Sequence, residues 1–343
     1  MASCKKDNGA PCCTLPSTDS ANVYVVCEGN LGNGDGSLYL YRPKKDSTYG
    51  DVYNIANKKI LGDVFQSMTR IGDNLFLCVN NSDKVVVINA NNWQEVSTIN
   101  IPKPRYILQV SSTKAYVSTL FSEKIYVINP QTFSITGSIS LPYQNPEKLL
   151  LHKNVAYACT WDTACNHLYT IDINTDKVTD SIQLTGKAPQ EILLDKEQKL
   201  WILSGNAPEG KVATIDRYDP DAKKMLASYA FSPSADPLRP VFNNTADTMY
   251  FIEANYNGGI ENNGIYRMGI KEASLPATPF IAAHAFQYFW ALGIDPVTGY
   301  IYVGDPKGFT QKGSVTIYRP DATTITHFAS GIGPGHFYFD EHK

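Results

Sequence analysis

Seven short aromatic segments recur along the chain at intervals of 40 to 52 residues, and this repeat restricts the fold more than any other feature. Each segment is rich in β-branched and aromatic residues and follows a polar turn, as β-strands do. Self-similarity at such a period indicates a repeat architecture rather than a single sheet or bundle. The aromatic residues of the seven segments are Tyr24, Phe76, Tyr116, Tyr157, Trp201, Tyr250 and Tyr302.

Each aromatic segment belongs to a group of strand-like segments. In the repeat of Tyr116, the expected strands cover residues 106–110, 115–117, 124–128 and 135–141. Four strands in about 40–50 residues are typical of one blade of a β-propeller.

The first aromatic segment has no strand before it, whereas residues 333–339 have the pattern of a first strand with none after them. We therefore expect the C-terminal strand to join the first blade, which leaves no open sheet edge. The sequence predicts an all-β, seven-bladed β-propeller with four antiparallel strands per blade, in one domain over residues 21–343. A β-sandwich or a solenoid is the alternative.

Charge and hydropathy exclude two classes of protein. Lysine and arginine number 30 and aspartate and glutamate 33, so the net charge is −3. A nucleic-acid-binding protein needs a basic face, and we expect no nucleic-acid partner. No apolar stretch approaches the roughly 20 residues of a membrane-spanning helix.

The first residues resemble a processed targeting segment. Small residues directly precede Cys4, as at the end of a bacterial lipobox, and the polar run that follows suits a flexible tether over residues 1–20. This pattern predicts lipidation of Cys4 and attachment to a membrane through that anchor only. An ordinary chain terminus with an incidental cysteine is the alternative.

The seven cysteines do not suggest a metal site, because no C-x-x-C motif occurs and no histidine pair has zinc-binding spacing. We expect no bound metal. Cys159 and Cys165 flank a short loop and are either a disulfide or two separate thiols.

Candidate ligand contacts lie in the loops before the first strands and between the second and third strands, which share one face of a propeller. Loops on a rigid scaffold often carry recognition residues. Aromatic, amide and arginine side chains together suit a large ligand with an apolar ring and a hydrogen-bonding edge. The candidates are Phe65, Arg105, Tyr106, Tyr143, Gln144, Asn145, Trp161, Asp162, Gln190, Arg239, Tyr256, Phe286, Tyr288, Phe309 and His336.

Catalysis is the weaker hypothesis. The chain has no G-x-S-x-G motif, and its six histidines are scattered. We therefore expect no catalytic residue and no required cofactor. A propeller lyase or lactonase remains an alternative, as does a scaffold for protein interaction or a surface layer.

The repeat resembles a known family. Residues 186–194, GKAPQEILL, lead to Leu200-Trp201-Ile202-Leu203, which is similar to the G-x-x-P…(Y/W)-V-x-N pattern of YVTN or YncE-like propellers. The resemblance covers residues 20–340 and implies the fold rather than a function. Prolines recur just before the expected first strands, at Pro104, Pro146, Pro189, Pro237 and Pro334.

The arrangement of Cys4, tether and propeller is similar to Bacteroidota surface lipoproteins of the BtuG type, which are DUF5074-like. This resemblance implies capture of cobalamin (vitamin B12) or another corrinoid and its transfer to a TonB-dependent outer-membrane transporter. It also implies a lipid-anchored protein at the outer membrane and cell surface, or alternatively in the periplasm. Asparagine and glutamine would match the carboxamides of a corrinoid, and Arg105 or Arg239 its phosphate.

Overall fold

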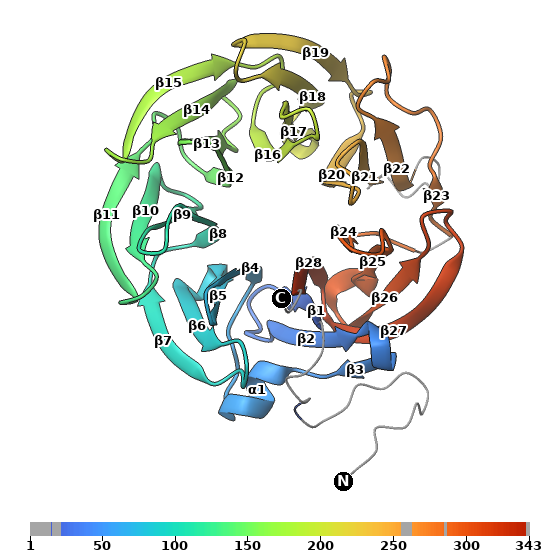
Figure 1. Cartoon of the computed structure of the whole chain (residues 1–343). Coiled ribbons are helices and arrows are strands. Elements are labelled where there is room, and N and C mark those ends of the chain that lie inside the picture. The colour runs from blue at the N-terminus through green and yellow to red at the C-terminus, as the bar shows by residue number, and fades with distance from the viewer. Residues whose placement is uncertain (1–14, 16–21, 255–262, 285–286, 341–343) are drawn as a thin grey trace. The chain divides into compact units, whose positions relative to one another are not determined.

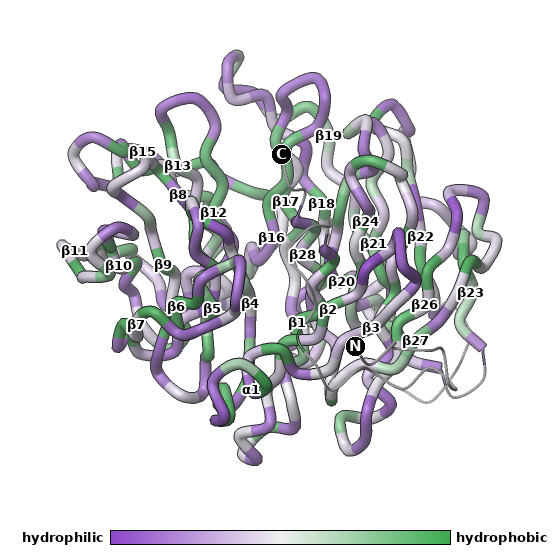
Figure 2. Tube along the Cα trace, turned by 60° about the horizontal axis from the view of Figure 1, so that its bottom comes forward, coloured by the Kyte–Doolittle hydropathy of each residue, from purple (hydrophilic) through white to green (hydrophobic). Residues whose placement is uncertain are grey.

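The computed structural model describes residues 15, 22–254, 263–284 and 287–340. Their contacts divide the chain into unit 1, residues 1–103 and 287–343, and unit 2, residues 104–286. The described residues form seven four-stranded antiparallel sheets with almost no helix, and the fold is the predicted seven-bladed β-propeller. Strands are mainly hydrophobic and connecting loops mainly hydrophilic (Figure 2).

Unit 1 holds three of the sheets. The N-terminal sheet is completed by the last strand of the chain, β28, which lies beside β1 (Figure 1). The predicted closure of the first blade by the C-terminal segment is therefore confirmed. The three sheets are β28 (Pro334–Asp340), β1 (Asn22–Cys27), β2 (Ser37–Arg42) and β3 (Ser47–Tyr49); β4 (Phe65–Ile71), β5 (Asn74–Val79), β6 (Lys84–Asn89) and β7 (Glu95–Asn100); and β24 (Ala291–Ile294), β25 (Ile301–Asp305), β26 (Lys312–Tyr318) and β27 (Thr324–Ile332).

Short helices interrupt the loops of unit 1. The α-helix α1 (Val52–Asn57) begins where the Asp51 carboxylate accepts a hydrogen bond from the Asn54 amide, the usual role of an aspartate N-cap. This helix was not predicted from the sequence. The 3-10 helices of the unit are η1 (Pro43–Lys45), η2 (Asn80–Ser82) and η4 (Lys307–Phe309).

Unit 2 holds the other four sheets. In Figure 1 the first strand of each sheet lies on the concave side of this unit and the last strand on the convex side. The sheets are β8 (Pro104–Gln109), β9 (Ala115–Thr119), β10 (Lys124–Asn129) and β11 (Ser134–Ser140); β12 (Pro146–His152), β13 (Val155–Thr160), β14 (His167–Asp172) and β15 (Lys177–Gln183); β16 (Pro189–Leu194), β17 (Leu200–Asn206), β18 (Lys211–Asp219) and β19 (Lys224–Ala230), with η3 (Ala207–Glu209); and β20 (Asp236–Phe242), β21 (Thr248–Ala254), β22 (Gly264–Gly269) and β23 (Ile281–Ala282).

The core of each unit lies between neighbouring sheets. Successive side chains of a strand point to opposite faces, so the second strand of a blade serves two cores. Tyr24 and Val26 of β1 pack toward β4–β7, whereas Val23 and Val25 pack toward β24–β27. Both faces are buried, which explains the unbroken apolar character of the aromatic segments.

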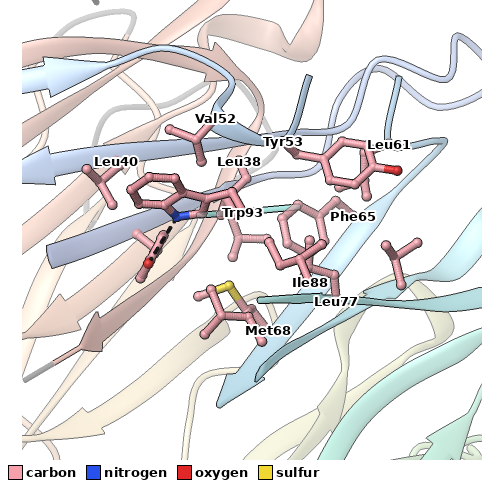
Figure 3. Packing of buried hydrophobic residues seen from close by; sticks show 14 of the residues in the cluster. Leu38, Leu40, Val52, Tyr53, Leu61, Phe65, Met68, Leu77, Ile88 and Trp93 are labelled. Atoms are coloured by element: carbon pink, nitrogen blue, oxygen red, sulfur yellow. Dashed lines mark hydrogen bonds between the residues drawn. The ribbon is translucent and has the colours of Figure 1, made fainter. Parts of the chain in front are cut away.

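Trp93 anchors the core on the β4–β7 side of the first sheet (Figure 3). Its indole is 1% exposed and donates from Nε1 to the Tyr24 hydroxyl at 3.2 Å, so its polar atom is satisfied inside an apolar cluster. Phe65, a predicted ligand contact, is fully buried in the same cluster. That prediction is wrong, because the side chain of the first residue of β4 faces the neighbouring sheet and not solvent.

Candidate functional site

The first strands begin in a recurring backbone conformation. In unit 2, Asn145 and Ala188 adopt left-handed φ values of 62° and 56° directly before Pro146 and Pro189. Proline lacks an N–H donor and is tolerated at the first position of a strand. The register then shifts by a β-bulge within the next few residues of β8, β12, β16 and β20. Bulges redirect side chains and are frequent beside functional sites.

Asn145 joins two loops through its backbone and its side chain. Its N–H donates to the Ser122 carbonyl at 2.9 Å, and its Oδ1 accepts from the Phe121 amide at 2.7 Å. Its carbonyl accepts from the Trp161 amide at 2.7 Å, and its Nδ2 donates to the Trp161 carbonyl at 3.3 Å. The side-chain amide is thus hydrogen-bonded within the protein, where it joins the loops of Phe121 and Trp161.

Trp161 and Gln190, from neighbouring blades, meet at the Gly205 carbonyl of β17. The Trp161 indole Nε1 and the Gln190 amide Nε2 each donate to the Gly205 carbonyl at 3.2 Å. Both side chains are half-buried, so each keeps part of its surface exposed to solvent. We call Phe121, Asn145, Trp161, Gln190 and Gly205 the loop network.

A buried ion pair links the first strands β8 and β12. The Arg105 Nε and Nη2 atoms both lie 2.8 Å from Glu147 Oε1, and the side chains are 16% and 3% exposed. Burial raises the pKa of the Glu147 carboxyl despite the opposing effect of Arg105. Burial acts most strongly and lowers the pKa of Arg105, but the charges of Glu147 and Tyr106 and the hydrogen bond to Glu147 together outweigh it, so that pKa is raised.

Tyr106, the next residue of β8, is surrounded by cations. The Lys148 ammonium lies 4.1 Å from its ring centroid, and the Arg105 guanidinium 5.8 Å. The Arg239 Nη1 atom approaches the Tyr106 hydroxyl at 3.5 Å. Arg239 has a left-handed φ of 51° before Pro240, inside the bulge of β20. Arg105, Tyr106, Glu147, Lys148 and Arg239 form what we call the first-strand cluster.

The cluster corrects part of the prediction. Tyr106 is 8% exposed, and Arg105 spends its Nε and Nη2 donors on Glu147, so these two residues support the site more than they present a surface. Glu147 and Lys148 were not among the predicted site residues. Their signal was available, since Glu147 follows Pro146 as Arg105 follows Pro104.

Unit 1 brings two other predicted residues together around Trp290. Tyr288 stacks on Trp290 with centroids 6.1 Å apart and planes at 20°, and Phe309 meets its edge at 5.4 Å and 84°. The Trp290 Nε1 atom donates to Glu28 Oε1 at 3.0 Å. A Cβ on Gly333 would lie 2.7 Å from the Phe309 ring, so only glycine permits this packing.

Glu253 is an ionisable residue that the sequence analysis did not single out. It stands on β21 opposite Pro237 of β20, is half-buried, and has no ion pair or side-chain hydrogen bond to any described residue. Burial raises the pKa of its carboxyl.

The remaining predicted residues have mixed placements. Tyr143 packs partly against the core of its blade, and Gln144 is exposed. Asp162 Oδ1 accepts from the Ala164 amide and shapes the loop after β13. His336 is half-buried on β28. Tyr256, Phe286, Cys4 and most of the expected tether lie outside the described residues.

The structure does not contain the disulfide that was one of the two alternatives for Cys159 and Cys165. Cys159 and Cys165 are buried free thiols, and no disulfide joins them. Burial raises the pKa of both thiols, which disfavours the reactive thiolate.

Across the described ranges, no three His, Cys, Asp or Glu side chains gather to hold a metal ion. Within the same ranges, no helix has the length and apolar character needed to cross a membrane.

Solved structures with the same fold differ widely in sequence. A quinonprotein alcohol dehydrogenase-like protein of Bacteroides thetaiotaomicron is 15% identical, with a TM-score of 0.69 over 93% of this chain and 78% of that one. The periplasmic gluconolactonase PpgL of Pseudomonas aeruginosa is 9% identical, with a TM-score of 0.69 over 93% and 98%. Hydrazine synthase of Kuenenia stuttgartiensis is 12% identical, with a TM-score of 0.64 over 81% and 92%.

At these identities the likenesses show the fold alone. No curated protein sequence matches the chain. Residues 21–340, nearly the whole propeller, match a single family described as a domain of unknown function. The chain therefore belongs to the DUF5074 family.

Proposed function

We propose that this protein is a non-enzymatic binding protein that captures cobalamin or another corrinoid. The observation that carries the proposal is the loop network of unit 2, in which the half-buried Trp161 and Gln190 are oriented by a shared carbonyl. An indole supplies stacking area at low conformational cost, and an amide both donates and accepts hydrogen bonds. A corrin macrocycle offers a flat apolar face and a margin of carboxamides to this combination.

The first-strand cluster supplies charge of the appropriate sign. Lys148 of β12 and Arg239 of β20 bring two further cations to Tyr106, beside the Arg105–Glu147 pair. Lys148 also approaches Glu191 at 3.9 Å, a long contact. Arginine and lysine groups on one side of a site favour an anionic group such as the single phosphate of cobalamin.

Capture at the cell surface is the second part of the proposal. A lipid on Cys4 would hold the protein at the outer membrane, and a TonB-dependent transporter would receive the bound ligand. The resemblance of the sequence to BtuG-type lipoproteins supports this part. Metabolic labelling with a palmitate analogue tests it, because a C4S variant should lose the label and leave the membrane fraction.

Equilibrium titration of the purified protein with cyanocobalamin tests the binding. We expect saturable binding at micromolar ligand or below, and coloured ligand that stays with the protein through a desalting column. W161A should weaken binding about tenfold, because it removes the stacking surface. A W93F change in unit 1 alters a tryptophan buried in the core and serves as the control. Absence of binding by the wild-type protein at micromolar ligand would refute the proposal.

A further inference from the structure

Phe121 is held in an unfavourable environment for a phenylalanine. Its side chain is 72% exposed, and its backbone has a left-handed φ of 57°. Glycine or asparagine adopts this conformation with less strain, and a phenylalanine gains nothing from folding when its ring stays in water. Stability of the fold therefore does not explain the residue.

The chain nevertheless fixes the loop of Phe121 firmly. The Asn145 side chain accepts the Phe121 amide at 2.7 Å, and the Asn145 amide donates to the next carbonyl, that of Ser122, at 2.9 Å. Asparagine suits this position twice, since it tolerates a left-handed φ and carries both a donor and an acceptor. Ala188 holds the corresponding place before β16 and has no side chain able to make such bonds.

The same asparagine fixes Trp161. Two hydrogen bonds join the Asn145 backbone and side chain to the Trp161 backbone, and the indole is oriented by the Gly205 carbonyl. Phe121 and Trp161 come from different blades yet are both bound to one side chain. Rigid aromatic side chains that are ordered before binding lose little entropy when a ligand stacks on them.

We propose that Phe121 is a ligand-contacting residue that stacks on the same flat apolar ligand as Trp161, and that Asn145 is the positioning residue for both. This inference rests on the proposed function and extends its site to the loop between β9 and β10. It accounts for an exposed, strained phenylalanine and for the four hydrogen bonds centred on Asn145.

Cyanocobalamin titration of F121N tests the contact. Asparagine suits the left-handed φ, so F121N should unfold at or above the temperature of the wild type while its Kd rises about five- to tenfold. F133N is the matched control. Phe133 also has a left-handed φ, 55°, and lies in the same blade, but at the opposite end of β10. Its replacement should leave the Kd unchanged.

N145G tests the positioning role. Glycine keeps the left-handed backbone but removes both side-chain hydrogen bonds, so its Kd should rise as in F121N. The Kd of the double variant F121N/N145G should then exceed that of either single variant. Its fold-change relative to the wild type should, however, be smaller than the product of the two single fold-changes. A purely structural asparagine would give multiplicative effects instead.

The outcomes separate the two proposals. Wild-type binding with an unchanged Kd in F121N overturns the role of Phe121 and leaves the proposed function standing. Absence of wild-type binding overturns both. If F121N fails to fold, F121L keeps an apolar side chain without the ring, and its Kd decides the same question.

Discussion

Replacing one member of the buried ion pair of Arg105 and Glu147 should lower the stability of the protein strongly, and replacing the second member as well should restore most of it. Removing one member of a buried ion pair costs about 3–5 kcal/mol, because the other charge is left without compensation. Glu147 is 3% exposed, so an E147L change should isolate the Arg105 charge. Arg105 is 16% exposed, and partial hydration places the expected cost near the lower limit, about 3 kcal/mol.

Thermal unfolding gives a direct measurement. For roughly 320 folded residues, an unfolding entropy of about 2.1 cal/mol/K per residue amounts to about 0.7 kcal/mol/K. E147L should therefore lower the Tm by about 4 °C. The double variant R105M/E147L removes both charges and keeps similar volumes, so it should regain most of this loss.

The double variant also supplies the decisive comparison. A Tm of E147L within about 1 °C of the wild type would refute the argument that this pair is desolvated. A double variant no more stable than E147L would refute the argument that the isolated charge causes the loss. K44M, which removes an exposed cation after β2, should change the Tm by less than 1 °C and controls for charge alone.

Three further predictions follow from single groups. Hydrogen bonds from Asn243 and the nearby Lys196 ammonium hold the pKa of Asp247 well below its ordinary 3.8. The ionised Asp247 therefore stabilises the protein above pH 3.8, and the Tm should fall as the pH drops below about 4. In D247N this fall should be less steep. Burial raises the pKa of Glu253, so its ionised form lowers the stability of the protein at pH 7. E253Q should therefore raise the Tm at pH 7 but not at pH 4. Equal Tm shifts at both pH values would contradict this assignment. A Cβ on Gly186 would overlap Thr214 Oγ1, so G186A should destabilise the protein by about 1–3 kcal/mol in denaturant titration. G137A is the control and should lose less, because the nearest atom to its added carbon, Val127 Cβ, lies 3.9 Å away.

The repeat was sufficient to predict the blades because the aromatic strands are buried on both faces. Tyr116 and Trp201 follow the same pattern, since each contributes to a core between neighbouring sheets. Closure by residues 333–339 was predictable for a similar reason, as an unpaired strand needed a partner. The short helix α1 was not, because six residues with a single N-cap give too weak a periodic signal.

The site was harder to predict than the fold. Loop composition pointed to Trp161, Gln190 and Arg239 as ligand contacts, which stays a prediction; in the structure all three have polar partners, and composition did not distinguish contacts from supports. Asn145 turned out to use its amide within the protein, and Phe65 is buried. Such roles depend on the direction in which a bulged strand turns each side chain. The alternation of apolar and polar residues along the sequence does not show where a bulge lies.

The pairing of β28 with β1 has a consequence for biosynthesis. β28, the edge strand that pairs with β1 in the first sheet, is translated after all the other described strands, so β1 carries an unsatisfied edge from its synthesis until residues 334–340 emerge. A nascent chain cannot complete its first blade before these residues emerge, and a stop codon before residue 334 leaves that edge exposed to aggregation or proteases. Closure of the first sheet therefore has to wait for residues 334–340, more than 300 residues after β1.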